Sequence, residues 1–166
     1  MSRLQLAIEQ VMFARNYTIR LLDQTPATEW FQQPPGGVSH IAWQVGHLAF
    51  AEFSLALCDI RGPQHQDADL ISEKHLTLFG PDSVPEFDPA GHPDPAEIRA
   101  ALDGVHEQVL RELSGLGEAE LDQPVPHPHP YAKTKLLALL WCAHHEMLHA
   151  GQVGLLRRQL GYPPLW

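Results

Sequence analysis

The chain has 166 residues, the size of one ordinary domain, and 44% of them are hydrophobic, which is enough to build a sizeable core. Twenty acidic residues against eleven Lys and Arg give a net charge of −9, which argues against nucleic acids and anionic membranes as partners. Two cysteines are too few for a disulfide framework, and the sequence shows neither a signal peptide nor an uncharged apolar run of membrane-spanning length. We therefore expect one soluble, cytoplasmic domain over residues 1–166.

Fifteen prolines cluster and leave four windows of at least 25 residues that contain none. Proline inside a helix costs about 3 kcal/mol, so long windows without it are where helices can form. The windows are 1–25, 36–62, 96–123 and 131–162.

Helix-start signals stand at or near the beginning of each window. Ser2 is the predicted N-cap of the first helix, and Ser39 is the predicted N-cap of the second. The third has the strongest signal, Asp94-Pro95-Ala96-Glu97, with an acidic cap, proline at the first helical position and glutamate at the third. The fourth is expected to start at Thr134 and to run to Leu160.

The pattern predicts an all-α fold, because no alternating run typical of a strand occurs. Four helices of this length favour a four-helix bundle with a long irregular connection between the second and third helices. That connection, residues 62–94, is too long for a plain loop and is expected to hold a short helix within 66–78.

The strongest chemical signal is a pair of histidines in the fourth helix, His145 and His149. They are one turn apart and lie within roughly 40° of each other on the helix surface, so both imidazoles can reach one metal ion. Apolar neighbours place them on the core-facing side, where two adjacent histidines need a partner. Metal ligation is favoured over two core histidines bonded to ordinary acceptors.

The second helix offers a third ligand, His47, which lies near the middle of that helix. His40 and Cys58 share roughly the same face but lie roughly 10 and 16 Å away along the axis, too far to share one ion with His47. Trp43 and Trp141 each precede a candidate ligand by one turn. They are expected to pack in the core, or alternatively to wall a pocket above the metal.

Glu146 completes an HExxH string, which is typical of zinc metalloproteases. No Asp, Glu or His follows His149, and the extended form of the motif would need histidine where Leu155 stands, so a protease is not expected. A di-iron bundle is excluded because a second Glu-x-x-His and inward glutamates on the partner helices are not found. The loop histidines, which are His65, His75, His92, His127 and His129, are expected to be exposed. His144 lies at the edge of the apolar stripe and is expected to face solvent or a partner.

Two stretches together resemble the DinB-like superfamily. Residues 37–49 look like its second-helix signature, and residues 145–152 followed by Leu156-Arg157-Arg158 look like its last helix. The superfamily includes bacillithiol S-transferases and mycothiol-dependent maleylpyruvate isomerases. The resemblance implies a bundle with a non-sequential helix order and a divalent metal held by three histidines.

Carried over position by position, the ligands implied by the resemblance are His47, His145 and His149, the same set as that reached from spacing. Gly151 and Gln152 match a Gly-Gln pair of the family. We interpret Gly151 as a close-packing site and Gln152 as a hydrogen-bond partner for a ligand histidine. No residue that contacts a thiol cofactor can be carried over, so the catalytic residues stay unassigned.

Three functional hypotheses follow. The first is a transferase in which Zn²⁺, or alternatively Ni²⁺, Fe²⁺ or Mn²⁺, activates a low-molecular-weight thiol cosubstrate toward an electrophile. The second is a metal-containing stress or ligand-binding protein without turnover. The third is a metal-dependent hydrolase with Glu146 as a weak candidate base. The apolar tail, residues 162–166, favours a homodimer, with packing on its own bundle as the alternative.

Overall fold

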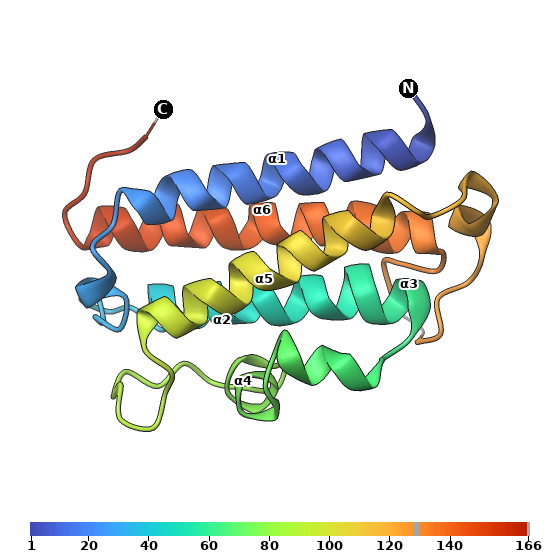
Figure 1. Ribbon diagram of the computed structural model, residues 1–166. Coiled ribbons are helices and arrows are strands. Elements are labelled where there is room, and N and C mark those ends of the chain that lie inside the picture. Colours follow the sequence, from blue (N-terminus) through green and yellow to red (C-terminus); the bar gives the residue numbers. More distant parts are fainter. Residues whose placement is uncertain (128–129, 166) are drawn as a thin grey trace.

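The computed structural model describes residues 1–127 and 130–165, and within these ranges the fold is all-α, as predicted. Four long helices run along the molecule (Figure 1): α1 (Arg3–Asp23), α2 (Ile41–Glu52), α5 (Pro95–Leu113) and α6 (Lys135–Gln159). The first and last helices lie side by side, and α5 crosses against α2. The spatial order of the helices is therefore not their order in the chain, as the family resemblance implies.

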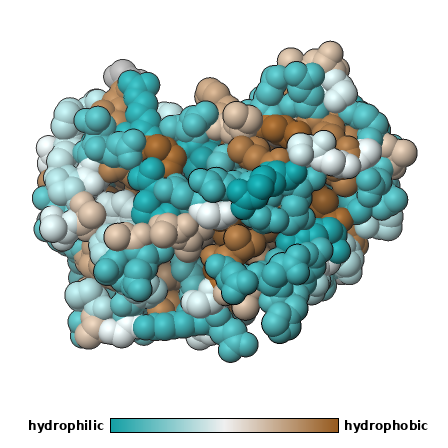
Figure 2. Space-filling model, viewed as in Figure 1, coloured by the Kyte–Doolittle hydropathy of each residue, from teal (hydrophilic) through white to brown (hydrophobic). Residues whose placement is uncertain are grey.

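Amphipathic patterning explains why these helices associate. Apolar residues on the inner faces form one main core that includes Leu21, Leu48, Leu102 and Leu139, all with no more than 1% exposure. Burying such side chains is the main driving force for a bundle. On the face seen in Figure 2, hydrophilic residues cover most of the surface and hydrophobic residues show between them.

Three of the four helix starts are as the sequence predicts. The Ser2 hydroxyl accepts from the Gln5 amide at 3.0 Å, and the Thr134 hydroxyl accepts from the Leu137 amide at 3.3 Å. Asp94 and Glu97 each accept from the other's backbone amide at 2.9 Å, which completes the capping box. These bonds satisfy amides that have no partner within the helix.

The start of α2 differs from the prediction by one residue. The N-cap is His40, whose Nδ1 accepts from the Trp43 amide at 3.2 Å. Ser39, the predicted cap, instead accepts from the side-chain amide of Gln44 at 2.8 Å. An imidazole nitrogen can replace a hydroxyl here because the cap needs only an acceptor.

The second helix continues beyond α2 through a π-helical segment (Phe53–Cys58) and α3 (Asp59–Arg61), and it stops at Gly62 with a φ of 83°. The helix ends where the sequence predicts, whereas the π-helical segment was not predicted. By length and composition Ile41–Arg61 could cross a membrane, but 78% of its most apolar window is buried in the bundle, as is typical of a core helix.

The connection after this helix has the local structure expected of it. It contains a 3₁₀ turn, η3 (His65–Asp69), and the short helix α4 (Glu73–Phe79), which packs against α2. A Cβ on Gly46 would lie 2.4 Å from Cγ of Phe79, so only glycine allows this approach. The contact brings the Phe79 carbonyl to the side of α2 that carries His47.

Gly46→Ala is therefore expected to lower the free energy of unfolding by about 1–3 kcal/mol, because Phe79 must move to make room for the methyl group. Gly104→Ala in α5 is the matched control, since no atom lies within 4 Å of the added Cβ, and it is expected to stabilise the chain by about 0.5–1 kcal/mol. Urea unfolding measures both. A fully stable Gly46→Ala chain would contradict the close contact.

The C-terminal tail lies on its own bundle as far as it is described. The Leu165 carbonyl accepts from Arg20 at 3.0 Å, and the Tyr162 hydroxyl donates to Glu29 at 2.9 Å. Arg157 lies over the Tyr162 ring, 5.4 Å from its centroid. Because the tail packs on its own bundle, it no longer supports a homodimer, which stays a prediction. Trp166 is outside the described residues.

Candidate metal centre

Three imidazoles converge between α2 and α6. One ligand atom from each of His47, His145 and His149 lies within 4.8 Å of the others. The ring centroids are 5.3 Å apart for His47 and His145, 4.8 Å for His47 and His149, and 4.5 Å for the pair on α6. Donors on a tetrahedral ion with bonds of about 2.1 Å are about 3.4 Å apart, so small side-chain shifts would close the group around one ion.

Hydrogen bonds behind two of these rings fix which nitrogen faces the centre of the group. His47 Nδ1 lies 2.8 Å from the Phe79 carbonyl, and His149 Nδ1 lies 2.6 Å from Oε1 of Gln44. Both partners are oxygens that only accept, so each Nδ1 carries a hydrogen and each Nε2 keeps a free lone pair. This arrangement is typical of metal-binding histidines.

The electrostatics keep these rings neutral. Burial, followed by the neighbouring imidazoles of His145 and His47, lowers the pKa of His149 to about 3. Burial also lowers the pKa of His47 below its ordinary value. Neutral imidazoles are the form that binds a metal ion, so His47 and His149 need no deprotonation near neutral pH.

Comparisons with known proteins agree with this fold. The model of the DinB superfamily matches residues 10–153. The chain belongs to the DinB superfamily. A crystal structure of a conserved protein from Enterococcus faecalis has the same fold, with a TM-score of 0.67 and 19% identity over 98% of this chain and 99% of that one. No curated protein matches the chain.

Aromatic side chains flank the histidines of this DinB-superfamily chain. Trp43 stacks on His47, with centroids 4.8 Å apart and planes 8° from parallel, and its indole donates to the Ser83 hydroxyl at 3.0 Å. The Trp141 ring centroid lies 6.1 Å from that of His145 and 4.5 Å from that of the exposed Tyr131. Both tryptophans are partly exposed, so they border the site instead of lying wholly in the core.

Two residues assigned by the family resemblance lie elsewhere. Gln152 is exposed and borders a cavity of about 290 Å³ that Gln44 also lines, but the hydrogen-bond partner of His149 is Gln44. Gly151 is exposed, and no atom lies within 4 Å of the Cβ it lacks, so it is not a close-packing site. Gln44 stands one turn before His47 on α2, but its bond to His149 depends on the packing of α2 against α6, which no local sequence signal shows.

Glu146 does not face the three histidines. It is 2% exposed and accepts from Arg15 at 2.8 and 3.1 Å, inside the bundle instead of on the helix flank where we expected it. Glu52 on α2 is buried as well and binds Arg15 at 2.7 Å. The expectation that α2 carries no inward glutamate was therefore wrong, although this carboxylate is committed to an arginine.

The remaining candidates take other roles. Cys142 is buried and Cys58 half-buried, and burial raises the pKa of both thiols, to about 11 for Cys58. Neither is a nucleophile at neutral pH. His127 is exposed as expected, with Nδ1 3.5 Å from Asp59 Oδ1, while His129 lies outside the described residues. The expectation that His75 is exposed was wrong, because α4 packs against α2 and buries this ring with Nε2 2.9 Å from the Gly46 carbonyl oxygen.

Proposed function

We propose that this DinB-superfamily protein is a metal-dependent transferase that activates a low-molecular-weight thiol toward an electrophile. His47, His145 and His149 would hold one divalent ion, Zn²⁺ first, with Ni²⁺, Fe²⁺ or Mn²⁺ as alternatives. The observation that carries the proposal is the pair of oxygen acceptors behind His47 and His149, which turns two Nε2 lone pairs toward one point.

The donor set suits a thiol. A divalent ion held by three neutral imidazoles would keep at least one coordination position open for the thiol sulfur. The Lewis acidity of the ion would favour the thiolate form of the bound thiol. The Phe79 carbonyl and Gln44 Oε1 accept the Nδ1 hydrogens and so keep the rings of His47 and His149 oriented. Burial, which lowers the pKa of both residues, keeps these rings neutral. The protein's own thiols have raised pKa values, which supports a nucleophilic sulfur that comes from a cosubstrate.

The hydrolase alternative needs a general base beside the open coordination position of the metal. Glu146, the candidate for this role, is poorly placed for it. The Glu146 carboxylate is buried and bound through both oxygens to Arg15. A general base must reach the water it deprotonates. A thiol reaction does not need this base, because the thiol proton passes to the buffer once the metal lowers the thiol pKa.

The test is the conjugation of chlorodinitrobenzene with several low-molecular-weight thiols, followed by absorbance. The thiolate sulfur bonds to the aromatic carbon, chloride leaves, and the thiol proton passes to the buffer. We expect turnover with zinc-loaded protein, and only the uncatalysed rate after chelation or in His149→Ala. A protein that holds metal but gives no turnover with any thiol or with monochlorobimane would favour the ligand-binding hypothesis instead.

A further inference from the structure

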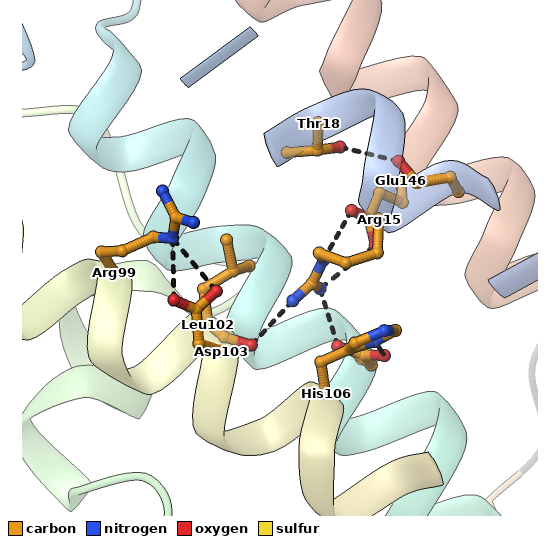
Figure 3. Close-up of polar contacts among 9 residues, drawn as sticks. Arg15, Thr18, Arg99, Leu102, Asp103, His106 and Glu146 are labelled. Carbon is orange, nitrogen blue, oxygen red and sulfur yellow. Dashed lines mark hydrogen bonds and ion pairs between the residues drawn. The ribbon is translucent and has the colours of Figure 1, made fainter. Parts of the chain in front are cut away.

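A buried ionic cluster lies in the centre of the bundle and is not explained by the proposed reaction. Arg15 of α1 binds Glu146 of α6 at 2.8 Å and Glu52 of α2 at 2.7 Å, and its third nitrogen donates to the Leu102 carbonyl of α5 at 2.7 Å. His106 of α5 lies 2.7 Å from the other oxygen of Glu52. Figure 3 shows Arg15 at the centre of this cluster. One guanidinium thus joins all four long helices.

The two carboxylates are close in sequence to the candidate ligands. Glu146 follows His145 directly, and Glu52 is five residues after His47. Glu52 is also the last residue of α2 before the π-helical segment, where the helical register changes. Arg15 therefore cross-links the two helices that carry the three histidines, at the level of the site on α6 and just beyond it on α2.

Stability alone is a poor reason for this cluster. Arg15, Glu52 and Glu146 are each no more than 2% exposed, and burying charges costs several kcal/mol per ion before their attraction is counted. Apolar residues of similar volume often stabilise a core as well or better. A guanidinium gives directional bonds at fixed angles, which apolar contacts do not.

We propose that Arg15 is a positioning residue for the candidate metal centre. By binding Glu146 through two nitrogens and Glu52 through one, it fixes the rotation of α6 and the spacing between α6 and α2. That geometry brings His145 and His149 opposite His47. The inference rests on the proposed metal site and adds the device that assembles it.

The test compares cobalt binding in the wild type and in the combined variant Arg15→Met, Glu52→Gln, Glu146→Met. This variant removes every charge of the trio and keeps an oxygen acceptor for His106. We expect its helical circular dichroism and urea midpoint to stay near the wild type, whereas cobalt affinity falls about tenfold and the visible Co²⁺ spectrum changes. A purely structural role would not move the spectrum of a folded chain.

A second cluster provides a matched control. Arg61 also binds two carboxylates, Asp67 at 2.7 Å and Glu112 at 2.6 Å, but it lies roughly 20 Å along the helix from His47. Arg61→Met, Asp67→Asn, Glu112→Gln should leave cobalt affinity and spectrum unchanged. If the triple variant at Arg15, Glu52 and Glu146 does not fold, Arg15→Lys replaces it in the test. Lysine keeps the positive charge but lacks the planar guanidinium donors, so this variant is expected to show the same spectral change.

The outcomes separate the two proposals. A folded Arg15 variant with wild-type affinity and spectrum would overturn the positioning role and leave the metal site intact. Wild-type protein that binds no cobalt would overturn the metal site itself, and the positioning role with it. An equal loss in the Arg61 control would show a general effect of lost ion pairs and would also overturn the positioning role.

Discussion

His47→Ala and His149→Ala are each expected to reduce bound metal from about one ion per chain to less than about a tenth. Each variant removes one of three convergent donors, and two imidazoles hold a divalent ion far more weakly than three. The two residues come from different helices, so a loss in both variants would place the ion between α2 and α6. Mass spectrometry of metals on untagged protein, after zinc or nickel is offered, gives the number directly.

His144→Ala is the matched control for these variants. His144 is exposed and lies beside His145 on α6, so its removal lowers the histidine count without touching the candidate centre. It should retain about one ion per chain. Less than about a tenth of an ion per chain in the wild type would instead show that the three residues are core histidines without a metal. That result would contradict the transferase proposal.

The helices could be predicted because their signals are local. Proline excludes a helix wherever it falls in an interior, and caps such as Ser2 and Asp94 act within one turn. The pair His145 and His149 is local in the same sense, since the α-helical period alone puts both on one face. These features needed no knowledge of which helices pack together.

What the sequence did not show depends on contacts between helices. Gln44 reaches His149 only because α2 and α6 are neighbours, and the residues are 105 positions apart. Arg15 looks like an ordinary charged residue of an amphipathic helix until three other helices surround it. The π-helical segment is equally hidden, since an apolar run is compatible with either helical register.

Gln44→Leu is expected to weaken zinc affinity about 10–100-fold while the three histidines remain. Oε1 of Gln44 accepts the Nδ1 hydrogen of His149 at 2.6 Å, and leucine offers no acceptor in this nearly fully buried position. His149 would then be free to rotate or to take the other tautomer, with Nε2 protonated and unable to bind. Competition with a chromophoric chelator measures the affinity.

Gln152→Leu is the matched control, because it is the same substitution on α6, beside the cavity of about 290 Å³ that Gln44 also lines. It should keep wild-type affinity, since the partner of His149 is Gln44. Gln44→Glu keeps an oxygen acceptor and should keep tight binding as well. Weakening in Gln152→Leu but not in Gln44→Leu would reverse the assignment and return the role to the residue that the family resemblance favoured.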